Sequence, residues 1–150
     1  MSCSKCAEIP DFHKFIKLGK TNQGYRIYYI KFTVTSYQEL NEEAVNNLLS
    51  HLDQISSKPW IWIINTNELD NLKTPNIFVL RTFYTEIQKR YKNTLKKILV
   101  INKSTMLNII YNMLYPFLST EIVELFVFCS TDKPLIELGL EDKIITKIFC

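Results

Sequence analysis

Three short runs of apolar residues without alternation constrain the fold of this 150-residue chain most strongly. They are WIWII at residues 60–64, ILVI at residues 98–101 and LFVFC at residues 125–129. A strand with one wet face alternates apolar and polar side chains, whereas a strand inside a parallel sheet has helices on both faces and reads as a continuous apolar run. The three runs therefore predict buried strands of a parallel sheet.

Segments with helical periodicity separate these runs. Apolar residues recur at spacings of three and four over residues 42–55, behind the capping residue Asn41, and over residues 77–91, behind Thr74-Pro75. Strand, helix and strand thus alternate along the chain. This order predicts an α/β protein with a mostly parallel sheet and crossover helices.

A further strand is predicted in YRIYYIKFTV, residues 25–34. One of its sides mixes Ile27 and Tyr29 with Lys31 and Thr33, so we expect this strand near a sheet edge with that face half wetted. The length of the chain indicates a single domain.

The segment STMLNIIYNMLYPFLS, residues 104–119, has the length of a helix but lacks a polar face. Between Met106 and Leu118 the strongly polar residues are Asn108 and Asn112. A surface helix normally has one polar side, so the outer side of this helix needs a cover. A neighbouring element, a second subunit, a hydrophobic guest, a membrane surface or a partner protein would supply it. The run is shorter than the about 20 residues that span a bilayer, so no transmembrane helix is expected.

The formal net charge of +3 is too small to indicate a nucleic-acid partner. The positive charge is local, because no acid occurs between Glu86 and Glu121. Two interpretations remain open for this stretch: contact with an anionic membrane, or a solvated helix end with ordinary lysines. Its cations are Lys89, Arg90, Lys92, Lys96, Lys97 and Lys103.

The sequence gives no support to an enzyme. With three glycines the chain contains neither a phosphate-binding loop nor a dinucleotide motif, and it lacks a nucleophile elbow and a metal-ligand series. His13 and His51 are far apart. Cys3-x-x-Cys6 has the spacing of half a zinc site or of a thiol redox pair, but its place near the N-terminus favours an unpaired tail motif. We predict no enzyme activity, no metal and no cofactor other than a bound lipid.

The cysteines also bear on the compartment. The four cysteines show no framework of paired spacings, and the start MSCSKCAEIP lacks the apolar core of a signal peptide. A reducing cytosol is therefore expected. We expect residues 1–20 to form an N-terminal tail and residues 21–150 to form the α/β domain.

The sequence from Tyr91 to Ser130 resembles the signature of the CRAL-TRIO, or Sec14-like, lipid-binding domain. In that family a tyrosine closes a helix, a leucine and lysines lead into an apolar strand that ends in asparagine, and a long apolar helix ends in Pro-Phe-Leu before a last strand. Asn65 stands where the preceding strand of the family ends in an aspartate. The resemblance covers roughly residues 24–130, and the places named are taken here by Tyr91, Leu95, Lys96, Lys97, Asn102, Pro116, Phe117 and Leu118.

Several residues depart from the usual pattern of the family, and these departures indicate which branch the chain resembles. Lys92 and Lys103 stand where the family commonly has proline, and the usual glycine pair and the helical N-terminal lobe are missing. The chain is therefore more similar to the divergent, minimal branch, which includes modules attached to Rho GTPase-activating proteins. Members of that branch often bind proteins as well as lipids.

In this family the long apolar helix is a gate over a hydrophobic pocket whose floor is the sheet. The resemblance implies non-enzymatic binding of a hydrophobic ligand or phospholipid by a cytoplasmic protein. It also implies peripheral association with anionic membranes, in which the six cations contact the lipid headgroups. The alternatives are a dry core beneath the helix, and a scaffold whose exposed helix docks into a small-GTPase or GAP-type partner or into a second copy. The residues predicted to line the pocket are Ile63, Ile101, Leu107, Ile110, Tyr111 and Leu114.

Overall fold

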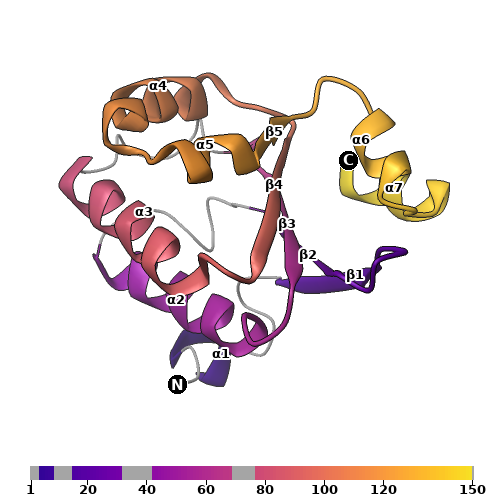
Figure 1. Ribbon diagram of the computed structural model, residues 1–150, viewed down its shortest axis with the longest axis horizontal. Helices are drawn as coiled ribbons and strands as arrows, with labels where there is room; N and C mark the ends of the chain where they lie inside the picture. The colour runs from indigo at the N-terminus through magenta and orange to yellow at the C-terminus, as the bar shows by residue number, and fades with distance from the viewer. Residues whose placement is uncertain (1–3, 9–14, 32–41, 69–76, 150) are drawn as a thin grey trace.

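The computed structural model describes residues 4–8, 15–31, 42–68 and 77–149. Five strands form one sheet in the order β1-β2-β3-β4-β5 (Figure 1). β1 is antiparallel to β2, and the other neighbouring pairs are parallel. The predicted α/β fold with a mostly parallel sheet is confirmed. The strands are β1 Ile16–Lys20, β2 Arg26–Lys31, β3 Trp60–Asn65, β4 Leu95–Ile101 and β5 Phe126–Phe128.

Helices cover both faces of this sheet (Figure 1). One face packs against α2 Glu42–Ile55, α3 Ile77–Tyr91, α4 Thr105–Leu114 and α5 Thr120–Leu125. The other face packs against the short helices α6 Lys133–Glu137 and α7 Asp142–Phe149. A 3₁₀ turn, η2 Tyr115–Phe117, follows α4, and the N-terminal helix α1 Ser4–Glu8 lies beside α2.

The strand β3 is buried along its whole length, with every residue at most 9% exposed. Its alternate side chains enter two separate hydrophobic clusters: Trp62 and Ile64 point toward α2 and α3, while Ile61 and Ile63 point toward α6 and α7. This two-sided burial explains why the run does not alternate.

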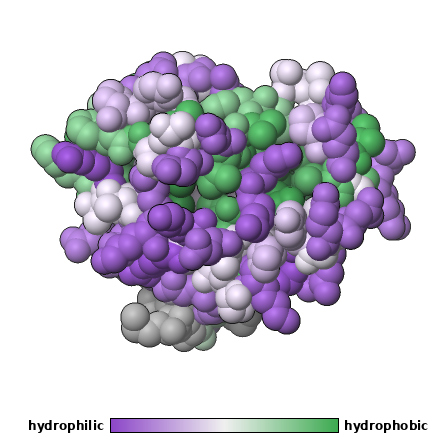
Figure 2. Space-filling model, in the orientation of Figure 1, coloured by the Kyte–Doolittle hydropathy of each residue, from purple (hydrophilic) through white to green (hydrophobic). Residues whose placement is uncertain are grey.

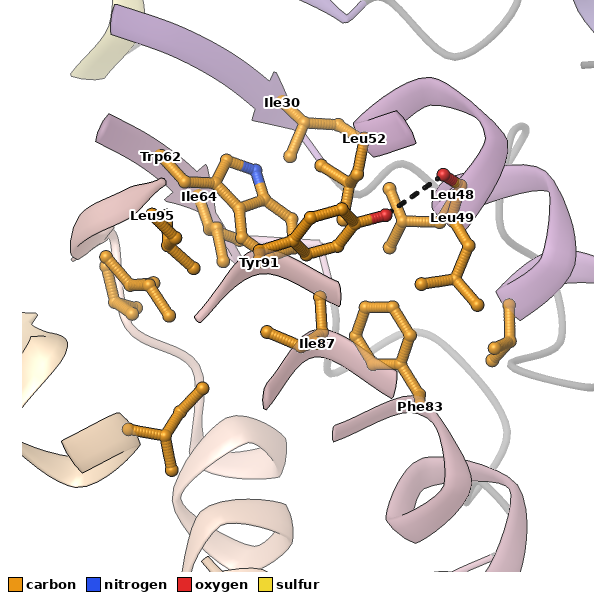
Figure 3. Close-up of a cluster of buried hydrophobic side chains, with 14 of the residues drawn as sticks. Ile30, Leu48, Leu49, Leu52, Trp62, Ile64, Phe83, Ile87, Tyr91 and Leu95 are labelled. Carbon is orange, nitrogen blue, oxygen red and sulfur yellow. Dashed lines mark hydrogen bonds between the residues drawn. The ribbon is translucent and has the colours of Figure 1, made fainter. Parts of the chain in front are cut away.

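Tyr91 lies inside the first of these clusters, which is shown in Figure 3. Its hydroxyl lies 3.3 Å from the carbonyl oxygen of Leu49 and 2.6 Å from the Asp53 carboxylate. The tyrosine at the end of α3 therefore holds that helix against α2.

The α4 segment begins and ends for local reasons. Ser104 is its N-cap, and the Ser104 hydroxyl accepts a hydrogen bond from the backbone N–H of Leu107 (3.1 Å). The helix ends at Leu114, because Pro116 has no N–H to continue the helical hydrogen bonds. Among the helices that the structure describes, none is long and apolar enough to cross a membrane.

Two expectations at the N-terminal side were wrong. Ile27 is fully buried and Tyr29 is 7% exposed, because β1 takes the sheet edge and α6 and α7 cover the face that was expected to be wet. The predicted tail over residues 1–20 includes β1, which pairs with β2. The predicted caps Asn41 and Thr74-Pro75, and residues 32–34 of the predicted strand, lie outside the described residues.

The C-terminal helices should therefore contribute strongly to stability. Leu135 in α6 is fully buried in the second cluster, whereas its neighbour Ile136 is 51% exposed. We expect Leu135→Ala to lower the free energy of unfolding by about 2–5 kcal/mol, because it leaves a cavity. Ile136→Ala, the control, should change it by less than about 0.5 kcal/mol. Urea denaturation measures both, and equal losses would contradict the packing described.

Candidate functional site

The helix α4 presents apolar residues on two sides. Leu107, Ile110 and Leu114 recur at spacings of three and four, face the sheet and are buried. Ile109 and Met113 lie on the other side and are 50% and 49% exposed. The inner side of this helix is thus packed against the protein. Its outer side is about half exposed among the described residues.

An apolar cavity of about 70 Å³ lies beneath α4, between this helix, α2, α3 and the sheet. An apolar cavity of about 150 Å³ accommodates benzene, so the space as it stands is smaller than one benzene ring requires. A lipid-sized guest would enter only if α4 or its neighbours moved outward. The lining residues are Ala44, Val45, Leu48, Trp62, Ile64, Thr66, Leu80, Phe83, Tyr84, Ile87, Ile98, Val100, Leu107, Ile110 and Phe126.

One hydrogen-bond donor in this lining lacks an acceptor among the described residues. Trp62 is 3% exposed, and its indole Nε1 is buried without a hydrogen-bond partner. Tyr84 also lines the cavity, and burial raises its pKa to about 12, with a further contribution from the neighbouring Tyr111. A buried donor without an acceptor costs about 1–3 kcal/mol, so an oxygen atom of a guest would be favourable here.

The third polar side chain of the lining is satisfied by the protein. The Thr66 hydroxyl donates to the carbonyl oxygen of Asn102 and accepts from the backbone N–H of Ser104, both at 3.3 Å. Thr66 therefore joins the ends of β3 and β4 to the start of α4. It has no unused donor for a guest.

The structure separates the six residues that were predicted to line the pocket. Leu107 and Ile110 line the cavity, and Leu114 belongs to the same cluster without reaching the cavity wall. Tyr111 lies beside the cavity, with its ring centroid 5.4 Å from that of Phe126. Leu107 and Ile110 therefore lie at a site under α4, whereas Tyr111 and Leu114 lie beside it.

The assignment of Ile63 and Ile101 to the pocket is corrected. Both belong to the cluster on the opposite face of the sheet, with α6 and α7. Successive residues of a strand point to opposite faces, so the neighbours Trp62, Ile64 and Val100 form the floor instead. The sequence shows which residues of the strand share a face, because alternate residues do. Since both sets are apolar, it does not show which set faces α4.

The predicted cations do not form one patch. Lys96 and Lys97 line a groove of about 280 Å³ between the sheet and α6, on the face away from the cavity. Figure 2 shows hydrophobic surface near β5 and between α5 and α6, bordered by hydrophilic residues. Lys103 follows the opposite end of β4, with its Nζ 5.0 Å from the ring centroid of Phe128.

The cations at the end of α3 are likewise remote from α4. Arg90 forms ion pairs with Asp53 and Glu86, each at 2.8 Å. Its hydrogen bond to Glu86 and, to a smaller extent, the negative charges of both carboxylates raise its pKa. Lys89 and Lys92 are exposed near the same helix end. The positive field is therefore divided between separate parts of the surface.

Asn65 is a structural residue that fastens the end of β3. It is fully buried, and its Nδ2 donates to the Tyr29 hydroxyl and to the carbonyl oxygen of Ile148, both at 3.1 Å. Its side-chain oxygen accepts from the backbone N–H of Asn67 (3.0 Å). The amide thus connects the central strand to α7. Within the described residues, no group of three or more His, Cys, Asp or Glu side chains is arranged to hold a metal ion.

Tyr84 should make the stability of the fold depend on pH in the alkaline range. Its folded pKa is about 12 and its ordinary value is 10.0, so the unfolded chain releases this proton first. The contribution of Tyr84 to stability is full below pH 10 and is lost as the pH rises to about 12. We expect Tyr84→Phe to reduce the decline in the free energy of unfolding over this range, measured by urea denaturation at several pH values. An unchanged decline would contradict the burial of the hydroxyl.

One comparison with known proteins bears on this site. A family model described as a divergent CRAL/TRIO domain matches residues 24–146. The match extends from the turn before β2 into α7, and so includes α4 and all the residues that line the cavity. No curated protein matches the chain.

Proposed function

Because the chain belongs to the divergent CRAL/TRIO family, we propose that it binds a hydrophobic ligand beneath α4 without catalysing a reaction. The observation that carries the proposal is the apolar cavity between α4 and the sheet. Its floor is the buried face of β3 and β4, and its roof includes Leu107 and Ile110. The ligand is held by burial, and α4 moves outward to admit it.

The lining also supports a chemical class for the ligand. None of the described lining residues is charged, so an anionic group has no counter-charge inside the cavity. The unpaired donor of Trp62 matches a neutral oxygen acceptor, such as an ester, a ketone, a hydroxyl or a protonated carboxyl group. The ligand is an apolar molecule with at least one such oxygen.

The outer side of α4 supports peripheral association with an anionic membrane. Ile109, Met113, Tyr115 and Phe117 are each about half exposed on α4 and η2. The Cζ atom of Arg81 lies 4.3 Å from the ring centroid of Phe117 and supplies a cation next to this apolar surface. Each cation near an anionic membrane contributes about 1 kcal/mol. A cytoplasmic location stays a prediction.

The same exposed side chains favour a second candidate function, a scaffold that binds a protein. A small-GTPase or GAP-type partner, or a second copy of the chain, would then cover Ile109 and Met113. The two functions differ in which side of α4 is used. Ligand binding uses the inner side, and docking uses the outer side alone.

Neighbouring residues of α4 provide a matched test of ligand binding. Ile110 is 5% exposed and lines the cavity, whereas Ile109 is 50% exposed. The methyl ester of a brominated fatty acid should quench the tryptophan fluorescence of the wild-type chain, because Trp62 lines the cavity. We expect Ile110→Phe to weaken this binding about tenfold, which is about 1.4 kcal/mol, and Ile109→Phe to leave it within about twofold.

A control guards against loss of folding, because overpacking a core costs about 1–3 kcal/mol. Ala44→Leu enlarges a smaller side chain on the α2 wall of the cavity and should also weaken binding. Circular dichroism reports whether each variant is folded. Equal binding by folded Ile110→Phe, Ala44→Leu and wild-type chains would overturn the proposed site.

The outer side of α4 is tested by Met113→Glu combined with Phe117→Glu. Both side chains are about half exposed, so the substitutions should leave the fold and ligand quenching intact. We expect sedimentation with anionic phospholipid vesicles to be lost, and Lys96→Gln with Lys97→Gln to weaken it less, since those lysines face the other groove. A stable dimer that these glutamates dissociate, without vesicle binding, would favour the scaffold instead.

A further inference from the structure

The groove between the sheet and α6 is separate from the cavity beneath α4 and is larger. Its volume is about 280 Å³, compared with about 70 Å³ for the cavity, and the two have no lining residue in common. Small-molecule sites in proteins begin at about 300 Å³, so the groove has room for a small ligand.

The floor of this groove is apolar and belongs to the second hydrophobic cluster. Ile61 of β3, Leu99 of β4 and Leu138 after α6 line the groove and are at most 9% exposed. The polar lining residues come from the turn between β1 and β2, from β4 and from α6. An apolar floor with a few polar groups around it is the usual composition of a small-molecule site.

A β-bulge brings two lysines to the groove together. In the pairing of β3 with β4, Trp60 lies opposite Leu95. The next residue of β3, Ile61, lies opposite Lys97, so Lys96 is an extra residue on β4. In a regular strand Lys96 and Lys97 would point to opposite faces, but here both line the groove. Bulges of this kind often re-aim a side chain next to an active site.

The protein does not neutralise these two ammonium groups. Lys96 and Lys97 are exposed, and neither forms an ion pair or a hydrogen bond with a described residue. Glu137 lines the same groove, but no ion pair joins its carboxylate to either lysine. The described lining thus carries two positive charges and one negative charge, and it attracts an anion.

Neutral hydrogen-bond donors lie in the same lining. The Thr21 hydroxyl accepts a hydrogen bond from the backbone N–H of Tyr25 (3.1 Å), which leaves the hydroxyl proton available. Gln23 and Tyr25 also line the groove, and their side chains form no hydrogen bond with a described residue. Donors therefore outnumber acceptors in this lining, as an anion with several oxygen atoms requires.

We propose that the groove binds a water-soluble phosphate monoester whose organic part carries a hydroxyl group. A phosphate monoester has about two negative charges and three strong acceptor oxygens at neutral pH. It therefore matches two ammonium groups and the neutral donors better than a carboxylate does. Lysine is a common phosphate ligand. The Glu137 carboxylate is the acceptor for the hydroxyl group of the ligand.

The position of the groove favours a soluble ligand over a lipid headgroup. Figure 1 shows α4 and α6 on opposite faces of the sheet, and the two hydrophobic clusters divide in the same way. A membrane that contacts the outer side of α4 therefore does not reach Lys96 and Lys97. The inference is independent of the ligand proposed beneath α4.

Glycerol 3-phosphate is the first probe, added to the full chain at constant ionic strength and followed by ¹H–¹⁵N NMR. We expect saturable shifts of the groove amides with a Kd below about 1 mM. Lys96→Gln and Lys97→Gln should each weaken binding about tenfold. Lys143→Gln, the matched control, removes an exposed lysine of α7 outside the groove and should leave binding within about twofold.

The spectra also report folding, and substitutions of exposed residues change stability little. The absence of saturable binding by the wild-type chain would overturn the proposal. Equal weakening by the substitutions of Lys96, Lys97 and Lys143 would overturn it as well, because the effect would then be that of net charge alone.

Two further comparisons test the class of ligand. Glycerol 3-phosphate should bind more tightly than methyl phosphate, which lacks a hydroxyl group, and Glu137→Ala should remove this difference. Equal binding of the two probes by the wild-type chain would overturn the assignment of the hydroxyl group. Release of the chain from phosphatidic acid vesicles by glycerol 3-phosphate would overturn the soluble ligand and assign the groove to a lipid headgroup.

Discussion

The burial of β3 on both faces is the constraint on which the rest of the structure depends. Trp60, Trp62 and Ile64 need cover on one side, and Ile61 and Ile63 need it on the other. Leaving such side chains in water costs about 1.5–3 kcal/mol each, so one layer of helices would not suffice. The helices α2 to α5 supply the first cover, and the two short C-terminal helices supply the second.

The helix α4 combines a packed inner side with an exposed apolar outer side. Opening it would expose Leu107, Ile110 and Leu114 at a cost of about 1.5–3 kcal/mol each, or about 5–9 kcal/mol together. A guest that buries about ten methylene groups offsets about 8 kcal/mol of this cost. A long aliphatic molecule is therefore sufficient to hold α4 open, whereas a guest of a few carbon atoms is not.

The sequence predicted those parts of the structure that follow from local patterns. The buried strands β3 and β4 and the helices α2 and α3 came from apolar spacing, and the inner positions Leu107 and Ile110 came from the family resemblance. The run at residues 125–129 was also predicted to be buried, but its strand β5 lies at the edge of the sheet and is half-buried. An unbroken apolar run does not show which of its residues point to which face of the sheet, so Ile63 was predicted on the wrong face. Contacts between segments that are far apart in the sequence could not be predicted from local patterns either. The covering of β2 by β1 and α7, and the meeting of Cys6 with His51, are examples.

Native mass spectrometry of the chain after incubation with mixed-lipid vesicles, followed by organic extraction of the bound molecule, tests the ligand site beneath α4 directly. We expect one added mass per chain, belonging to a long apolar molecule with a neutral oxygen acceptor. A bare chain mass at every vesicle concentration would contradict a ligand site beneath α4. The exposed side of that helix would then be its functional surface.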